Sequence, residues 1–359
     1  MSIQLSDKTI LKLSVLDKCP IEEERHAEDA LKNTLELAKL ADDLGYNRFW
    51  IAEHHNSLSL ASPSPEIVVA WLASQTKKIR LGSGGVMLQH YSAYKVAENF
   101  NLLANLAPGR IDLGIGKAPG GLPQSTQALQ RGINPEKKGS FEEQIEELNA
   151  YLTLNSSSHF VNLPSIKNTK ASESSLKVTP EPKLPADKFL LGASEESATL
   201  AGKLKWNFVY AAHLNGDKEK LKKTLIKWQS LSPLPTIVAV QVIIDEKSEQ
   251  AKKLAQSIEM WGVELDNGQR ITVQTKNQAL SFAEQAGRTI KRLERRDNTV
   301  ISGTAQEVYQ KLKAMQETYK IDEFIVEIPL ASQSVRKKTL KLLAEYVNTA
   351  LRHLEAEVI

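Results

Sequence analysis

The sequence predicts an α/β fold, a (β/α)8 or TIM barrel with insertions after its fourth and seventh strands. Short apolar runs alternate with longer segments of helical periodicity, as in a chain of repeated βαβ units. Each strand and helix pair takes up roughly 30 residues or more, the size of one such unit. An open, doubly wound sheet is the competing fold, and the number of strand candidates favours the closed barrel.

The length and composition agree with one domain over residues 1–359. Barrels of this type reach 359 residues as one unit, and 41% hydrophobic with 25% charged residues is ordinary for a globular protein with a sizeable core. Lys and Arg total 46 against 43 Asp and Glu, and the net charge of +3 is spread along the chain. Without a basic block, a nucleic-acid partner is not expected.

Cysteine usage and the N-terminus bear on the compartment. The single cysteine, Cys19, cannot form an internal disulfide or a thiolate metal cluster, which suits a reducing environment. The N-terminal segment is too charged, and its apolar run too short, for a signal peptide. No stretch is long enough to span a bilayer. We therefore expect a cytoplasmic protein with no membrane partner.

The strand candidates are short and apolar, as strands covered on both faces should be. In chain order they are residues 11–16, 48–52, 79–84, 110–116, 188–194, 207–213, 236–244 and 323–328.

Helices between these strands have recognisable ends. Apolar residues repeat at helical spacing over 30–44, and Gly45 follows as a stop. Ser64 and Pro65 open a second helix with a cap and a first-turn proline. The third helical pattern covers residues 96–107.

The later helices follow the same signals. Ser140 with Glu143 is a capping box before the fourth helix. Further helices are expected over 195–204, in a Lys-rich segment to about 230, and over 335–354 at the end of the chain.

Two segments break the alternation. Residues 154–187 are rich in Ser, Asn, Lys and Pro, and we interpret them as a long insertion lying over the fold. Residues 247–319 are expected to be largely helical, with a second insertion at about 262–298.

The second strand ends abruptly in Glu53, His54 and His55. In a barrel, the carboxyl ends of the strands carry the active site, so these side chains would border its mouth. The alternative is that Glu53 only accepts a hydrogen bond from a neighbour and that the histidines fill a polar rim. A metal site is disfavoured because adjacent strand residues project to opposite faces and His213 is the only other strand-end histidine in an obvious position.

Two further strand ends carry distinctive residues. The third strand runs into Gly82, Gly84 and Gly85, whose missing side chains permit an unusual backbone or the close approach of a flat ligand; a tight turn is the alternative. The fourth ends at Lys117, a cation suited to a phosphate or a polarised carbonyl, or a solvated surface lysine.

The fifth strand leads into a helix start. Gly192 lets the backbone turn, and Ser194 and Ser197 would place hydroxyls and free backbone N–H groups at the positive end of a helix. Such a tip can bind an anion or be an ordinary cap. An acid–base group, a glycine-lined wall, a cation and an anion site around one mouth suit flavin mononucleotide (FMN).

The chain resembles the bacterial luciferase-like flavin monooxygenases from about residue 11 to 350. The segments "RFWIAEHHN", "FLLGASEESATLAG", "NFVYAAHL" and "ISGTAQEVYQKLKAM" carry the likeness, together with the long, highly specific run over residues 62–121. The resemblance implies a (β/α)8 barrel in which reduced flavin lies across the mouth and, with O2, oxidises an organic substrate. It also places the family's histidine on His54, with Glu53 beside it.

The resemblance assigns other cofactor contacts as well. The small pair that carries a non-proline cis peptide in the family falls on Gly84 and Gly85, and the phosphate side falls on Ser194 and Ser197. Two positions depart from the pattern and put light emission in doubt. Lys117 replaces a frequent arginine, and Ala193, which we place with Gly192 among the cofactor-binding residues, replaces an acidic residue of light-emitting members.

We therefore expect a monooxygenase that uses reduced FMN and O2 to oxidise a small organic molecule. His54 is expected to act as an acid or base, because an unperturbed imidazole has a pKa near 6.5. A separate NAD(P)H-dependent reductase would supply reduced flavin, and a homodimer is in keeping with the family. The alternatives are a deazaflavin (F420)-dependent oxidoreductase of the same fold and a flavin-binding protein without catalysis.

Overall fold

The computed structural model describes residues 11–134, 138–153, 176–214, 216–297 and 299–357. Its centre is a closed parallel barrel, as the sequence predicts, and β13 completes the closure by pairing with both β8 and β1. In barrel order, the strands are β1 (Lys12–Asp17), β2 (Arg48–Ile51), β3 (Arg80–Ser83), β5 (Ile111–Gly116), β6 (Asp187–Gly192), β7 (Asn207–Ala211), β8 (Ile237–Ile244) and β13 (Glu323–Glu327).

Two short strands extend the barrel at its carboxyl end. β4 (Val86–Met87) continues beyond β3 and pairs with β5, and β12 (Ile301–Gly303) runs parallel to the last residues of β8. Two 3-10 turns follow, at Leu88–His90 after β4 and at Ala212–Leu214 after β7.

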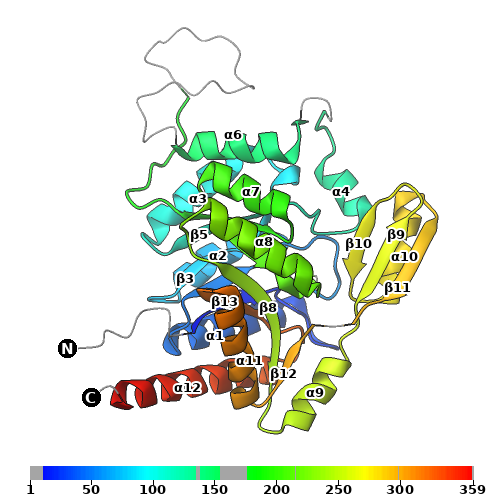
Figure 1. Ribbon diagram of the computed structural model, residues 1–359. Helices are drawn as coiled ribbons and strands as arrows, with labels where there is room; N and C mark the ends of the chain where they lie inside the picture. Colours follow the sequence, from blue (N-terminus) through cyan, green and yellow to red (C-terminus); the bar gives the residue numbers. More distant parts are fainter. Residues whose placement is uncertain (1–10, 135–137, 154–175, 215, 298, 358–359) are drawn as a thin grey trace.

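Helices surround the barrel (Figure 1). They are α1 (Ala27–Asp43), α2 (Pro65–Ala73), α3 (Ala93–Leu106), α6 (Phe141–Thr153), α7 (Glu195–Leu204), α8 (Lys218–Leu231), α11 (Ala305–Tyr319) and α12 (Gln333–Glu357). The predicted capping box of α6 is confirmed, with Glu143 N–H donating to Ser140 Oγ and Ser140 N–H to Glu143 Oε2. Ser64 precedes α2 as expected, but its side chain makes no capping hydrogen bond.

Two apolar layers follow from the alternation of side chains along the strands. One set faces the barrel axis: Leu16, Trp50, Ala52, Phe189, Val209, Ile237, Ala239 and Ile325. Their neighbours along the same strands, such as Phe49, Phe208 and Phe324, pack outward against the helices. The strands are buried on both faces, which explains their continuous apolar character in the sequence.

The segment between β8 and β12 forms a small sheet beside the barrel (Figure 1). α9 (Ser248–Gln256) comes first, and then β9 (Trp261–Leu265), β10 (Arg270–Val273) and β11 (Ile290–Arg295) pair antiparallel, with α10 (Lys276–Ala286) packed on them. The expectation of a largely helical 247–319 is confirmed at α9, α10 and α11 but is wrong for the three strands β9, β10 and β11. Gly268, with φ of +84° after Asn267, closes the hairpin that the helical interpretation overlooked.

This small sheet contacts the loop that follows β5. Leu122, next to α4 (Pro123–Leu129), packs into the apolar cluster of the sheet, and Gln124 N–H donates to Gln285 Oε1 of α10 at 3.2 Å. The loop and α4 that follow the fourth barrel strand, β5, thus contact the small sheet and α10 that follow the seventh, β8.

The predicted insertion at 154–187 lies mostly outside the described residues, which resume at 176. Its last part packs on α3: Val178 is completely buried, and Tyr94 Oη donates to the Lys177 carbonyl at 2.8 Å. In the part of the chain described here, no helix combines the length and the apolar character needed to cross a membrane.

Candidate functional site at the barrel mouth

The predicted site residues gather at the carboxyl end of the barrel, because the strands that carry them are parallel. Glu53 and His54 follow β2, Gly84 and Gly85 follow β3, Lys117 follows β5, and Gly192, Ala193, Ser194 and Ser197 join β6 to α7.

The Glu53 carboxylate is completely buried and accepts hydrogen bonds from the protein itself. Its Oε1 accepts from His55 Nε2 at 2.7 Å and from Tyr91 Oη at 2.8 Å, and its Oε2 accepts from the Met87 N–H at 3.0 Å. These contacts match the alternative that the sequence left open, in which Glu53 only accepts hydrogen bonds from its neighbours. The carboxylate then organises the strand ends. Glu53 ties the end of β2 to the backbone just beyond Gly85.

His55 and His90 attach the loop after β5 to this cluster. The His55 N–H donates to the Gly120 carbonyl at 2.8 Å, and His90 Nε2 lies 2.7 Å from the Pro119 carbonyl oxygen. The two imidazoles pack edge to face with centroids 5.7 Å apart. His90 and Tyr91 were not predicted as site residues, although both lie at the end of the glycine-rich run.

His54 projects away from Glu53 and His55, toward charged groups at the barrel mouth. Its Nδ1 is buried and has no hydrogen-bond partner among the described residues. Burial, the nearby Lys18 ammonium and the neighbouring imidazoles lower the pKa of His54 to about 3. The expected pKa near 6.5 is therefore wrong for this environment, and the ring is neutral at pH 7.

Four more polar side chains form the top layer of the barrel interior around His54. Lys18 Nζ lies 2.5 Å from Glu327 Oε1, Gln241 Nε2 donates to Glu327 Oε2 at 3.3 Å, and His213 Nε2 is 3.9 Å from the same oxygen. Only His213 attracted notice in the sequence. Lys18 follows β1 and Glu327 ends β13, a position that could have identified them, whereas Gln241 lies within β8, where it is the one polar side chain of an apolar run.

Charge in this layer is balanced by the ion pair. Burial opposes ionisation of Glu327, but the Lys18 charge and the hydrogen bonds from Lys18 and Gln241 outweigh it, and the pKa of this carboxyl is lowered. Burial lowers the pKa of His213 to about 4, despite the nearby carboxylate. Within the described ranges, no three or more His, Cys, Asp and Glu side chains are grouped so that they could hold a metal ion.

The peptide bond between Gly84 and Gly85 is cis, as the family resemblance implies. A Cβ on Gly84 would lie 2.5 Å from Leu16 Cδ1, and a Cβ on Gly85 would lie 2.8 Å from the Gly114 carbonyl oxygen. Contact with the barrel core and with the neighbouring strand therefore excludes side chains at both positions. Backbone packing is sufficient to explain this glycine pair.

The start of α7 carries two hydroxyls, as predicted. Ser194 Oγ accepts from the Ser197 N–H at 3.3 Å and lies 3.3 Å from Ser197 Oγ, and both residues are partly exposed. A Cβ on Gly192 would lie 2.5 Å from Ser197 Cβ, so only glycine lets the first turn of α7 approach the end of β6. The adjacent Ala193 packs against the outer core.

Lys117 reaches the neighbourhood of this helix start. The pKa of the exposed Glu196 carboxyl is lowered, first by a hydrogen bond with Ser194 and further by the charges of Lys220 and Lys117. Lys117 is itself exposed, which leaves its ammonium accessible. Hydroxyls, a helix N-terminus and two cations thus come together beside one carboxylate.

Comparison with known proteins agrees with this geometry. A family model described as luciferase-like monooxygenase matches residues 11–320. The N-acetyl-S-alkylcysteine monooxygenase of Bacillus subtilis is 38% identical over 349 residues, covering 96% of this chain and 100% of the relative. The chain belongs to the luciferase-like monooxygenase family. It is therefore an oxidoreductase of the monooxygenase type.

Solved structures share the fold of this luciferase-like monooxygenase. Apo-MsnO8 superposes with a TM-score of 0.72 at 28% identity, covering 95% of this chain and 98% of the other. More distant structures are the oxygenating constituent of 3,6-diketocamphane monooxygenase from Pseudomonas putida, in complex with FMN, and an F420-dependent secondary alcohol dehydrogenase. Their TM-scores are 0.66 and 0.63 at 17% and 15% identity; they cover 94% and 93% of this chain and 98% of each of theirs.

The family match ends before β13 and α12. The first seven barrel strands and both insertions lie within residues 11–320, whereas the strand that closes the barrel begins at Glu323. Glu327, which holds the top layer together, therefore comes from the part of this luciferase-like monooxygenase beyond the match.

Proposed function

We propose that the protein is a flavin-dependent monooxygenase that uses reduced FMN and O2 to oxidise a small organic substrate. The observation that carries the proposal is the pairing of two features at one end of the barrel. A neutral, partly buried imidazole at His54, whose buried Nδ1 has no hydrogen-bond partner among the described residues, lies at the same end of the barrel as the hydroxyl-bearing start of α7.

The residues at the start of α7 fit the phosphate of FMN. Ser194 and Ser197 offer hydroxyl and backbone donors, and Lys117 and Lys220 supply positive charge. Glu196 already interacts with these groups, so a phosphate would take over the hydrogen bond of Ser194 with this exposed carboxylate. Lysine in place of arginine gives a single point charge and cannot bind the phosphate through bidentate hydrogen bonds. We therefore expect a moderate affinity for FMN.

The remaining residues fit the ring system. Bound reduced FMN would supply the electrons and the reactivity toward O2. His54, neutral at pH 7, is suited to exchange a hydrogen bond with a ring atom or to move a proton when a charge develops nearby. Glu53 contributes by holding the Gly84–Gly85 segment through Met87, and is a positioning residue.

Substrate and partners follow from the family context. The similarity to N-acetyl-S-alkylcysteine monooxygenase over the whole length makes N-acetyl-S-alkylcysteines the first substrates to test. A separate NAD(P)H-dependent flavin reductase would supply reduced FMN, and pairing of two copies through the helices outside the barrel is in keeping with the family.

Phosphate recognition can be tested with a pair of ligands. FMN and riboflavin differ only in the phosphate, so Lys117→Met should weaken FMN binding about fivefold and leave riboflavin binding unchanged. Lys77→Met, an exposed lysine near the opposite end of the barrel, is the control. Fluorescence titration gives both affinities. Equal weakening of both ligands, or none, would reject the phosphate assignment.

Oxygen uptake separates the proposal from its rivals. With FMN, a flavin reductase and NAD(P)H supplied, an accepted substrate should accelerate O2 consumption and appear as an oxygenated product. Tighter binding of reduced F420 than of reduced FMN, without O2 uptake, would indicate the deazaflavin enzyme. Tight retention of oxidised flavin without substrate-dependent uptake would indicate a binding protein.

A further inference from the structure

The small sheet beside the barrel has one apolar and one charged face. Side chains alternate between the two faces along β9, β10 and β11, and one set packs with α10 in an apolar cluster. The opposite set is rich in charge. We call this side the arginine face, and its charged residues are Glu264, Arg270, Lys291, Arg292, Glu294 and Arg296.

Strand register places these charges side by side. Glu264 of β9 lies opposite Arg270 of β10 and opposite Arg292 of β11. Arg270 Nη2 is 3.1 Å from Glu264 Oε2, and Arg292 Nη2 is 2.6 Å from Glu294 Oε2. The carboxylates therefore hold the guanidinium groups in place on neighbouring strands.

Arg296, directly after β11, folds back over the centre of the sheet. A Cβ on Gly262 would lie 2.4 Å from Arg296 Nε, so the missing side chain of this glycine leaves the space that the guanidinium occupies. Arg296 Nη1 donates to Thr272 Oγ1 of β10 at 3.1 Å. A third guanidinium is thus brought next to the other two.

The cations of the arginine face are more exposed than its carboxylates. The side chains of Glu264 and Glu294 are 15% and 35% exposed. The exposed fractions of the cations are 71% for Arg270, 67% for Arg292, 66% for Lys291 and 39% for Arg296. Four cations and two carboxylates give the face a net charge of +2, with the positive groups outermost.

The ion pairs leave hydrogen-bond donors over. A guanidinium has five N–H donors, and in the described part of the chain Arg270 and Arg292 each approach a carboxylate through one nitrogen. A hollow of about 90 Å3 lies among these two side chains and Arg296. It is far smaller than the roughly 300 Å3 or more of a typical small-molecule site, so it fits a carboxylate head group better than a whole organic ligand.

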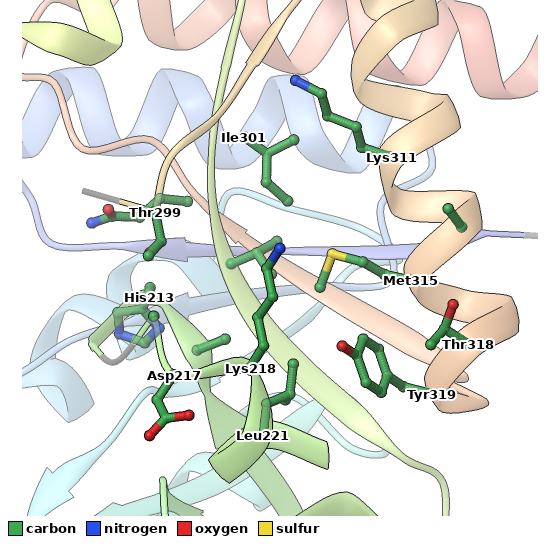
Figure 2. A pocket seen from close by; sticks show the side chains of 15 residues that line it. His213, Asp217, Lys218, Leu221, Thr299, Ile301, Lys311, Met315, Thr318 and Tyr319 are labelled. Carbon is green, nitrogen blue, oxygen red and sulfur yellow. The ribbon is translucent and has the colours of Figure 1, made fainter. Parts of the chain in front are cut away.

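The cavity between α8 and α11 has the opposite character. Its volume is about 440 Å3, and its walls are mainly apolar (Figure 2). The hollow on the arginine face is mainly polar. Charge, rather than apolar area, therefore determines what can bind to the small sheet.

We propose that the arginine face docks an acidic segment of a partner protein, with one partner carboxylate in the hollow between Arg270, Arg292 and Arg296. Opposite charge would steer the two proteins together, and hydrogen bonds from guanidinium to carboxylate would fix their orientation. A nucleic acid fits less well, because a net charge of +2 neutralises few phosphates and the two glutamates would repel the backbone. The docking site involves neither flavin nor the barrel mouth, so it does not depend on the proposed function.

The loop after β5 lies on the other side of the small sheet. Leu122 of this loop packs into the apolar cluster that α10 covers, and the Gln124 N–H donates to Gln285 of α10. Figure 1 shows the small sheet at the edge of the molecule, next to α4. A partner on the arginine face would therefore leave the loop that carries Lys117 uncovered.

A fluorescein-labelled oligoglutamate peptide is the probe for this face. With the full chain, its fluorescence anisotropy should rise saturably in about 20 mM NaCl, and the affinity should fall about tenfold in about 200 mM NaCl. Arg270→Gln combined with Arg292→Gln should also weaken binding about tenfold. Arg25→Gln combined with Arg131→Gln removes the same charge from exposed positions outside the sheet and should leave the affinity unchanged.

Thr272→Glu tests the face without removing an ion pair. It adds a carboxylate beside Arg296 and should weaken peptide binding about fivefold, with an unchanged circular dichroism spectrum; it replaces the arginine variant if that variant does not fold. Equal weakening by the Arg25 and Arg131 changes would mean that the peptide responds only to net charge, and would overturn the site. Tighter binding of an oligothymidylate of the same length would indicate a nucleic acid and overturn the protein partner.

Saturating FMN separates the arginine face from the cations near Ser194. FMN should leave the dissociation constant of the peptide unchanged. Displacement of the peptide by FMN would place it at the proposed phosphate site and overturn the docking site. Peptide binding by a protein that does not bind FMN would reject the proposed function and leave the docking site standing.

Discussion

The two ends of the barrel interior contain similar residue types but use them differently. At the amino end, Arg48 donates to Glu323 at 3.0 Å and to Asp112 at 2.8 Å, and the Trp50 indole N–H donates to Asp112 at 2.9 Å. Ser14 also donates to Glu323. Each of these buried charges has an oppositely charged partner.

At the carboxyl end the polar layer is incomplete. Lys18 and Glu327 pair, but His54 Nδ1, His213 Nδ1 and Gln241 Oε1 have no hydrogen-bond partner in the described part of the chain. The amino end therefore serves the stability of the barrel, and the carboxyl end leaves buried polar atoms unpaired, which fits the ligand site proposed there. This division is the one expected for a TIM barrel.

The largest expected effect is at the amino end. Arg48→Met would leave Asp112 and Glu323 buried with fewer compensating charges, and breaking a buried pair on one side costs about 3–5 kcal/mol. Urea denaturation should show this loss in the free energy of unfolding. The fraction that remains folded should bind FMN with unchanged affinity, since no site residue is altered.

Lys12→Met is the matched control. Lys12 approaches the same Glu323 at 3.9 Å but is half exposed, so its removal should cost at most about 1 kcal/mol. If Arg48→Met were equally mild, the amino-end network would not stabilise the barrel, and the contrast between the two ends would fail.

The second effect concerns pH at the carboxyl end. The pKa of His213 is lowered from 6.5 to about 4 in the folded protein, so the unfolded chain binds the proton more readily in the intervening range. The stability linked to neutral His213 is fully present above pH 6.5 and is lost as the pH falls toward 4. His213 alone should remove about 2 kcal/mol between pH 7 and pH 5.

His213→Gln should therefore flatten this acid dependence, measured as the free energy of unfolding in urea at several pH values. His54, whose pKa is lowered to about 3, should still cause a similar loss of stability as the pH falls. Gln241→Leu changes a neighbouring, equally buried side chain but keeps both imidazoles. The slope of its unfolding free energy against pH should therefore match that of the parent protein. An unchanged slope in His213→Gln would mean that this histidine is already charged in the folded state.

Much of the fold was predictable because its signals are local. All eight barrel strands and the α6 capping box are set by apolar runs and end signals within a few residues. The small β9–β11 sheet was missed because its strands are short, polar on one side and separated by a helix, so Asn267–Gly268 was the main signal available.

The site was predictable in position but less so in chemistry. Strand ends located His54 and the serines, since parallel strands bring their carboxyl ends together. The low pKa of His54 and the occupied carboxylate of Glu53 depend on Lys18, Tyr91, Met87 and other residues distant in sequence. Such pairings arise only when the barrel closes, and no local pattern specifies them.

The smallest expected effect tests whether the start of α7 is more than a helix cap. Ser194→Ala removes the hydroxyl that accepts from the Ser197 N–H, which should cost about 1 kcal/mol of stability. Thr304→Ala at the start of α11 removes an equivalent cap, whose Oγ accepts from the Glu307 N–H, and should cost about the same. Stability alone therefore cannot distinguish a ligand site from an ordinary cap.

FMN affinity distinguishes them. If the carboxyl end near Lys117 holds the phosphate, Ser194→Ala should weaken FMN binding about fivefold and leave riboflavin binding unchanged, whereas Thr304→Ala should change neither. Fluorescence titration of both ligands against both variants gives the four comparisons. If the two variants bound FMN equally well, Ser194 would be a cap like Thr304, and the phosphate would have to be held elsewhere on the mouth.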